Sequence, residues 1–189
     1  MASEVGIVNN ALLKLGENPI SSFEENSKAA RLAKETYADY RDALLRDNPW
    51  NFALKRVALA ASTTTPSWGY ANAFPLPSEP SFCLRVVEVQ NPSRITWKIE
   101  GRSIVTDIDA PLNILYVERV ADPNQMDSDF RDALSSFLAM NWAERITKSA
   151  EVYSMMSQQF NAKIKPARSI DGQEGTPTDI VYEWINARF

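Results

Sequence analysis

The sequence predicts an α+β fold: a four-helix bundle with a small antiparallel β-sheet domain inserted between helices 2 and 3, and an extended C-terminal tail. Apolar residues recur at three- and four-residue spacing in two stretches, which is typical of helices packed on a core. Between these stretches, prolines separate short runs of branched and aromatic residues, which indicates strands. The expected units are residues 1–50 and 121–168 as a discontinuous bundle, 51–120 as the inserted β domain and 169–189 as the tail.

Two helices are predicted before the inserted domain. Ser3 can cap the first helix and Gly16 can end it. The second is predicted over Ser27–Arg46, with Asn26 or Ser27 as its cap and Pro49 as its stop. Each has one apolar stripe: Val5, Val8, Leu12 and Leu15 in the first, and Ala29, Ala33, Tyr37, Tyr40 and Leu44 in the second.

The inserted domain is predicted to contain five short strands. A tight turn is expected at residues 100–102, where Gly101 stands between charged neighbours. The segment Ser62–Pro80 is rich in Ser, Thr and Pro, and we expect a surface loop that carries aromatic residues. The candidate strands are Phe52–Leu59, Leu84–Val89, Ile95–Ile99, Ser103–Thr106 and Leu112–Arg119.

Two further helices are predicted after the dipeptide Asp122-Pro123. The third begins at a cap formed by Asp127 or Ser128, and the fourth covers about Ser149–Ala167. The apolar stripe of the third helix contains Phe130, Leu134, Phe137, Leu138 and Trp142, and that of the fourth contains Val152, Tyr153, Met156, Phe160 and Ile164.

The tail combines a polar stretch, residues 171–177, with an apolar and aromatic end. Exposed Trp and Phe at a chain end gain nothing in a monomer, so we expect a partner to bury them. The alternative is a tail folded back on its own bundle. The residues expected in the contact are Ile180, Tyr182, Trp184, Ile185 and Phe189.

Composition disfavours catalysis and metal binding. The 189 residues include no histidine and a single cysteine, Cys83, which removes the commonest metal ligand and general base and any Cys/His nucleophile. Cys83 is therefore interpreted as a small buried hydrophobe. Carboxylate pairs exist at Asp107 with Asp109 and at Asp129 with Asp132, but such spacings are common in caps and turns. No enzyme activity, cofactor or metal site is predicted.

The net charge and the hydropathy limit the kinds of partner that this chain is expected to bind. The net charge of −4 offers no basic surface that would hold nucleic acid by counterion release. No apolar run approaches the roughly 20 residues that cross a bilayer, and no signal pattern opens the chain, so no membrane contact and synthesis in a cytoplasm are expected.

Fragments in both halves of the chain carry a family resemblance. The first half contains Asn10-Ala11-Leu12, Leu15-Gly16, Pro19-Ile20, Ser27-Lys28-Ala29-Ala30-Arg31, Tyr37, Arg41-Asp42, Leu44-Leu45 and Pro49-Trp50-Asn51-Phe52-Ala53. The second half contains Gly101-Arg102, Pro111-Leu112-Asn113-Ile114, Tyr116-Val117, Asp122-Pro123 and Gln173-Glu174-Gly175-Thr176-Pro177. In this order and spacing, the chain resembles the podovirus tail tubular protein A family of head-to-tail adaptors, also called connectors, over nearly its whole length.

The resemblance implies a structural virion protein made in a bacterial host cytoplasm and located in the neck of a tailed phage. Members of this family form a ring, typically of twelve copies, that joins the portal to a tail nozzle resembling tail tubular protein B. Double-stranded DNA passes through the lumen during ejection without sequence-specific binding. The family has no catalytic residues to carry over, and this short chain lacks any extra domain of larger members. The alternative is a cytoplasmic helical adaptor or regulator outside any virion, which predicts a monomer or dimer.

Three sets of residues are candidate contact sites. The tail residues are expected to bind the portal or a neighbouring subunit. An aromatic group in the loop, Trp68, Tyr70 and Phe74, contacts the nozzle or a subunit in one interpretation and packs locally in the other. Lys28, Arg31 and Lys34 lie along one helix and face the lumen or a subunit, or form a solvated helix face. The segment Pro49-Trp50-Asn51-Phe52 is an interface anchor in one interpretation and a hydrophobic hinge that packs the bundle against the sheet domain in the other, and we favour the hinge, with Trp50 in the core.

Overall fold

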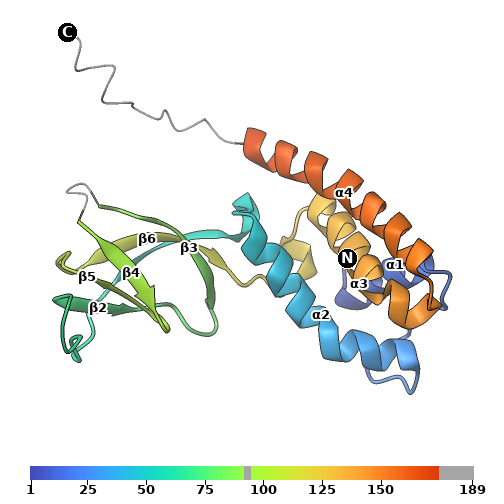
Figure 1. Cartoon of the computed structure of the whole chain (residues 1–189), viewed down its shortest axis with the longest axis horizontal. Helices are drawn as coiled ribbons and strands as arrows, with labels where there is room; N and C mark the ends of the chain where they lie inside the picture. The colour runs from blue at the N-terminus through green and yellow to red at the C-terminus, as the bar shows by residue number, and fades with distance from the viewer. Residues whose placement is uncertain (92–94, 175–189) are drawn as a thin grey trace, which may run out of the picture.

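The computed structural model describes residues 1–91 and 95–174 and confirms the predicted α+β class (Figure 1). The helices are α1 (Glu4–Lys14), α2 (Lys28–Asp47), α3 (Ser128–Thr147) and α4 (Ala150–Gln173). The strands are β1 (Leu54–Leu59), β2 (Asn72–Pro75), β3 (Cys83–Val89), β4 (Trp97–Glu100), β5 (Ser103–Thr106) and β6 (Leu112–Glu118). Short 3₁₀ turns cover Asn51–Ala53 and Pro123–Gln125. The helices gather at one end of an elongated molecule and the strands at the other.

Local sequence signals set the ends of α1 and α2 as predicted. The Ser3 hydroxyl accepts a hydrogen bond from the Gly6 amide at 3.0 Å, and the Ser27 hydroxyl accepts one from the Ala30 amide at 3.1 Å. Gly16 follows α1 with a φ of 76°, a conformation that glycine adopts without a side-chain clash. The α1–α2 loop is then held by Asn9, whose side chain donates to the Ile20 carbonyl and accepts from the Ile20 amide.

Helix α3 lies at the centre of the helical unit and contacts α1, α2 and α4. Its Trp142 is fully buried, and the indole Nε1 donates to the Thr36 hydroxyl of α2 at 3.0 Å. Its Asp132 accepts from Lys14 of α1 at 3.1 Å and pairs with Lys163 of α4 at 2.8 Å. The helices are therefore joined by one apolar core and by an ion-pair cluster at its edge.

Helix α4 is longer than predicted. It continues through Gln173, so residues 169–173, which the sequence assigned to the extended tail, are helical. Pro166 lies inside the helix and does not end it. The added turn is stabilised by a contact distant in sequence: Asp171 is 8% exposed, and its carboxylate accepts from the Asn51 amide at 2.8 Å.

The strands form two antiparallel sheets of three strands rather than one sheet, with orders β1-β6-β3 and β2-β5-β4. Strand β2 lies within the segment predicted as a surface loop, which corrects that prediction. The sequence did not predict this strand because its segment is rich in Ser, Thr and Pro, and the strand is defined by pairing with β5, which is distant in the sequence. The other five strands agree with prediction within two residues at each end.

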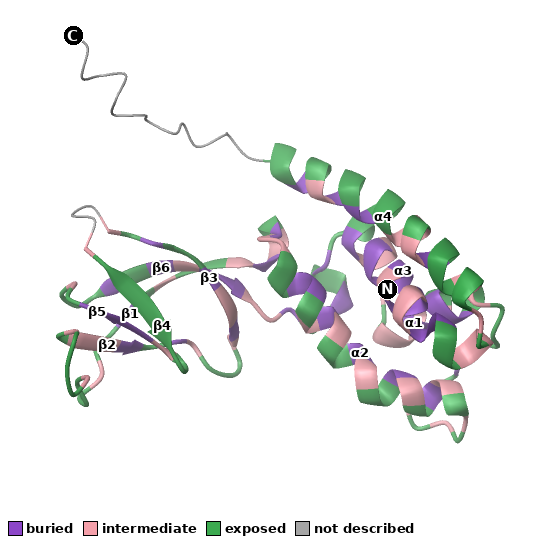
Figure 2. Cartoon of the chain, viewed as in Figure 1, coloured by how far each residue is buried: buried purple, intermediate pink, exposed green. Residues whose placement is uncertain are grey.

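The two sheets enclose a second, smaller apolar core. Phe74 of β2 and Ile104 of β5 are fully buried opposite each other. Leu112, Ile114 and Tyr116 of β6 contribute from the other sheet. Figure 2 shows buried stretches on β2, β5 and β6, whereas β4 is exposed along its length.

The junction between helices and sheets is packed by aromatic side chains. Trp50 is 1% exposed, its ring lies 5.1 Å from that of Phe130 on α3, and its Nε1 donates to the Leu44 carbonyl at 3.2 Å. This confirms the interpretation of Trp50 as core packing. Val117 and Val120 at the end of β6 join the same helical core. In the described part of the chain, no helix is both long and apolar enough to span a membrane.

Candidate interaction surfaces

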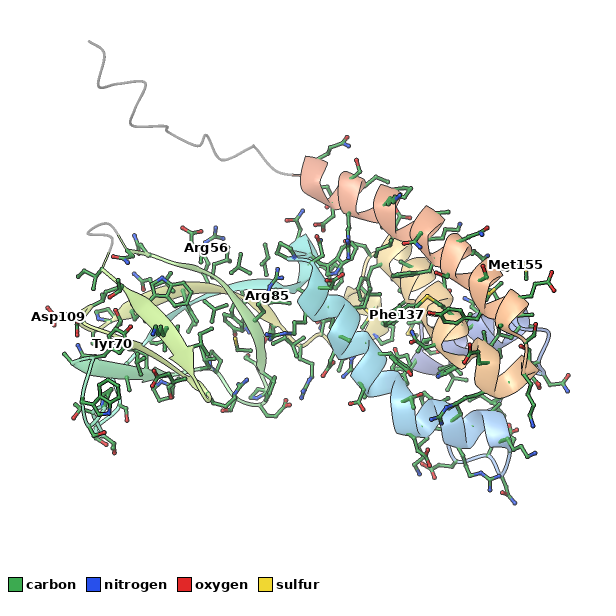
Figure 3. All side chains as sticks on the ribbon, in the orientation of Figure 1. Arg56, Tyr70, Arg85, Asp109, Phe137 and Met155 are labelled. Atoms are coloured by element: carbon green, nitrogen blue, oxygen red, sulfur yellow. The ribbon has the colours of Figure 1, made fainter. Side chains whose placement is uncertain are left out.

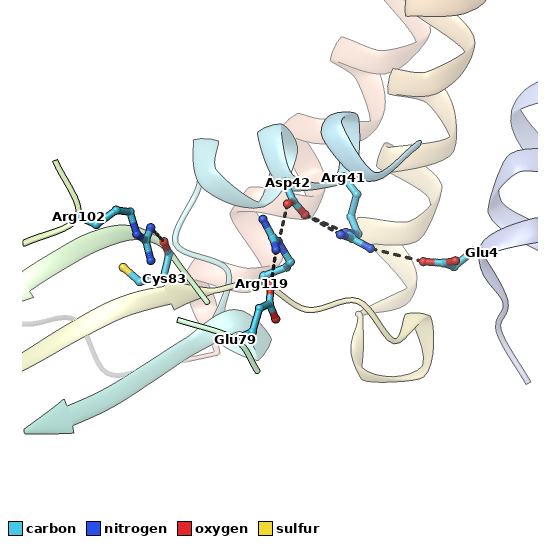
Figure 4. A network of polar contacts seen from close by, with 7 residues as sticks. All are labelled: Glu4, Arg41, Asp42, Glu79, Cys83, Arg102 and Arg119. Atoms are coloured by element: carbon cyan, nitrogen blue, oxygen red, sulfur yellow. Dashed lines mark hydrogen bonds and ion pairs between the residues drawn. The ribbon is translucent and has the colours of Figure 1, made fainter. Parts of the chain in front are cut away.

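A charged network ties the sheets to the helices at the junction (Figure 4). Arg119, just after β6, donates to Asp42 of α2 at 2.6 Å and to Glu79 of the β2–β3 loop at 2.5 Å. Arg41, only 7% exposed in its side chain, bridges Asp42 and Glu4. The network places carboxylates on both sides of the nearly buried Arg41, so the charge of this guanidinium is compensated.

The ring of Phe82 lies between two arginines beside this network. The guanidinium carbon of Arg102 is 4.0 Å from the ring centroid, and that of Arg119 is 4.1 Å from it. Arg102 also donates to the carbonyl of Cys83 at 2.8 Å. Burial raises the pKa of the Cys83 thiol, so it stays protonated, which confirms its interpretation as a buried hydrophobe. The sequence did not predict this cluster of charged and aromatic side chains, because its members are far apart along the chain.

The three aromatic residues predicted near the loop do not form one surface. Trp68 is 86% exposed, and Tyr70 is half-buried. Phe74 is fully buried in the core between the sheets, so its predicted interface role is corrected to core packing. Figure 3 places Tyr70 near Asp109 at the end of the sheets remote from the helices. Trp68 therefore remains the exposed aromatic residue of this loop.

Strand β4 forms a second exposed apolar surface that the sequence did not single out. Trp97 is 36% exposed and Ile99 is 47% exposed. They are two residues apart and so lie on the same face of the strand. Sheet order places β4 at an edge, because β5 is its neighbour on one side and none of the described strands pairs with the other side. Edge strands with exposed apolar side chains are templates for pairing with another chain.

Helix α4 also carries exposed apolar residues. Tyr153 is 42% exposed, Met155 54% and Ile170 49%. Met155 projects away from the helical core in Figure 3. The opposite side of α4 packs on α3 through Met156, Ile164 and Ala167. Met155 and Ile170 point away from this buried stripe, whereas Tyr153 borders it.

Lys28, Arg31 and Lys34 are all exposed on α2. Lys34 pairs with Glu24 at 2.7 Å, so one of the three charges is already neutralised locally. Lys28 borders a groove of about 670 Å³ between the α1–α2 loop and the end of α3. That groove contains both signs of charge: Lys28, Arg145 and Lys148 with Glu17 and Glu25. A mixed lining is not the uniform basic surface that tracks a phosphate backbone.

The predicted tail contacts at Ile180, Tyr182, Trp184, Ile185 and Phe189 lie outside the described residues. The structure therefore places the start of the segment at the end of α4 and leaves these five predictions as they stand.

One member of each carboxylate pair weighed for catalysis has a structural partner. Asp107 accepts from the Ala71 amide at 2.8 Å, and Asp132 is held by two lysines. The carboxylates of Asp127, Asp171 and Glu174 approach one another within 4.8 Å at the end of α4. Burial is the main cause that raises the pKa of Asp171, opposed by its hydrogen bond from Asn51. Asp171 thus connects α4 to the junction.

Comparison with known proteins identifies no relative: no protein-family model matches the chain, and no curated protein matches it.

Proposed function

We propose that this chain is a structural subunit of a head-to-tail adaptor ring in a tailed-phage virion, joining the portal to the tail nozzle and enclosing part of the DNA ejection channel. The observation that carries the proposal is the separation of its exposed apolar surfaces. Met155 and Ile170 are exposed on the outer side of α4, and other exposed apolar residues lie on β4 and on the loop carrying Trp68. A closed ring needs two different, complementary faces on each subunit, and spatially separate surfaces meet that requirement.

Residues of the family resemblance occupy structurally important positions, which supports the proposal. Ile20 is buried and clamped by Asn9, Trp50 fills the junction, and Asn51 binds Asp171 at the end of α4. Each of these residues of the resemblance thus makes a contact that holds the fold together.

In the proposed arrangement the four helices act as one bundle, and bundles stand side by side to close a ring of about twelve copies, the number that the family resemblance implies. The sheets, inserted between the second and third helices, form a platform for the nozzle. The C-terminal segment is the docking tail for the portal or a neighbouring subunit. The net charge of −4 suits a channel, because few lysine or arginine contacts would retain passing DNA.

Assembly in the presence of the portal protein tests the proposal. The purified chain is mixed with portal rings, and the product is examined by mass photometry and negative-stain electron microscopy. The expected product is a portal capped by a second closed ring of this chain. A chain that stays monomeric or dimeric at every concentration, with no portal complex, contradicts the proposal and favours a cytoplasmic adaptor or regulator.

A pair of variants makes the portal test specific to the tail. The substitution Trp184→Asp introduces a charge where the proposal requires apolar contact, and it should lower portal binding by at least tenfold. Thr65→Asp is the matched control, because Thr65 is exposed in the sheet unit and belongs to none of the proposed contact sites. If both variants bind the portal as tightly as the wild-type chain, the tail is not part of the portal contact.

A further inference from the structure

The free edge of β4 presents backbone groups as well as side chains. A two-residue loop, Gly101-Arg102, joins β4 to β5, and Gly101 has a φ of 58°. In a hairpin of this kind the flanking residues, here Glu100 and Ser103, exchange hydrogen bonds. The alternation along the strand then directs the amides and carbonyls of Ile99 and Trp97 toward the free edge.

The other sheet edges are protected. Arg46 and Arg102 donate to the carbonyls of Leu84 and Cys83 along β3. The Ser62 amide donates to the Ala73 carbonyl of β2 at 2.7 Å. Strand β1 carries two consecutive charged residues, Lys55 and Arg56, at its edge. Strand β4 also carries two charged residues, Lys98 and Glu100, but they alternate with Trp97 and Ile99 and so lie on the other face. Among the described strands, β4 thus combines a sheet edge with two exposed large apolar side chains on one face.

The apolar face of β4 continues the core between the sheets. Ile99 lies opposite Ile104 and Trp97 lies opposite Thr106, and both β5 residues are fully buried. The core therefore ends at two side chains that have neighbours on one side only. A further strand with apolar residues at every second position would extend it and cover both.

One segment of this chain has that pattern. From Asp179 to Ile185 the sequence reads Asp-Ile-Val-Tyr-Glu-Trp-Ile, so Ile180, Tyr182 and Trp184 alternate with other residues. An antiparallel register with Tyr182 opposite Ile99 brings Trp184 opposite Trp97. The same register brings Glu183 opposite Lys98, a pair of opposite charges on the other face.

We propose that the free edge of β4 binds residues 179–185 of a second copy of this chain by strand addition. The inference rests on the proposed ring and deepens it, because edge and segment are the two different faces that a head-to-tail contact needs. Backbone hydrogen bonds supply affinity in such a contact, and the alternate side chains set the register.

Disulfide trapping between full-length chains tests this pairing. One chain carries Ile99→Cys, and the other carries Tyr182→Cys and a size tag. The native Cys83 is 1% exposed and does not compete. Mild oxidation of the mixture should give a tagged–untagged dimer in at least fivefold higher yield than the control pair Val87→Cys with Tyr182→Cys. Val87 is a suitable control because it is also an exposed strand residue, at 37%, but on β3.

Charge exchange provides a second measurement that does not depend on cysteine reactivity alone. Lys98→Glu in the Ile99→Cys chain should reduce the cross-linking yield severalfold, because it places two carboxylates opposite each other. Glu183→Lys in the partner chain should restore it. A cross-linking yield that neither substitution changes would contradict the register.

Other outcomes overturn the inference without ambiguity. Equal yields for the Ile99 and Val87 pairs would contradict edge binding. A chain with both Ile99→Cys and Tyr182→Cys that closes only within a monomer would show that the segment covers its own edge. A portal-bound ring without cross-linking would refute strand addition but not the proposed function. A cross-linked pair that never forms a portal-bound ring would refute the proposed function.

Discussion

The helical unit and the sheet unit differ in how completely their apolar cores and backbone hydrogen bonds are closed. The helical core contains Trp50, Trp142 and Phe130, all at most 1% exposed, and every helix contributes to it. The sheet core is smaller, and it ends at an open strand whose apolar residues are half exposed. The difference shows where stability and interaction reside: a closed helical core holds the fold, while an open sheet edge is available to a partner.

The largest effect is expected in the helical unit, at Trp50. Trp50→Ala removes a fully buried ring and its hydrogen bond to Leu44, and it should lower the free energy of unfolding by about 4 kcal/mol. Urea denaturation followed by circular dichroism measures this. The control Trp68→Ala removes an exposed ring and should change stability by less than about 0.5 kcal/mol.

Phe74→Ala should act mainly on the sheet unit and sharpen the comparison. The cavity between the two sheets should cost about 3 kcal/mol, while helical circular dichroism stays close to that of the wild type. Hydrogen exchange measured by mass spectrometry should show faster exchange in β2, β5 and β6 than in α3. Equal acceleration in the helices would mean that the two units unfold as one.

A substitution at the junction tests how the units are held together. Arg119→Ala removes hydrogen bonds to Asp42 and Glu79 and the stacking on Phe82, and should cost about 1.5 kcal/mol. Part of this loss should disappear at high salt, because Glu79 is exposed and screened. Lys34→Ala, which breaks an exposed pair with Glu24, is the control and should cost about 0.3 kcal/mol.

The smallest effect concerns Asp171, and it depends on pH. Burial raises the folded-state pKa of this carboxyl above its ordinary value of 3.8, so its ionisation opposes folding. Its favourable contribution is complete below pH 3.8 and declines as pH rises through the folded pKa. Asp171→Asn keeps an acceptor for the Asn51 amide and should be more stable than wild type at pH 7, by less than about 1 kcal/mol. A stability difference that does not shrink on acidification would contradict this.

Local signals explain which elements the sequence predicts well. Ser3, Ser27 and Gly16 act within one turn of the helix ends they set, and their effects need no distant partner. The last turn of α4 escaped prediction because its partner, Asn51, is 120 residues away along the chain. Strand β2 escaped because pairing with β5 outweighs a composition typical of loops.

The same distinction between local signals and distant partners applies to the candidate surfaces. Exposure of Trp68 agrees with its place in a loop rich in serine and proline, whereas burial of Phe74 depends on a facing sheet that periodicity does not reveal. The edge position of β4 could not be predicted either, because strand order is a property of the assembled sheet. The exposure of a single residue depends partly on the local sequence, but the tertiary fold decides which residues share a surface.

The proposed adaptor ring is tested most directly by cryo-electron microscopy of the neck of a tailed-phage particle assembled with this chain. The account predicts a closed ring of this chain between portal and nozzle, with Trp184 and Phe189 buried against a partner. Absence of the chain from the purified particle would contradict the account.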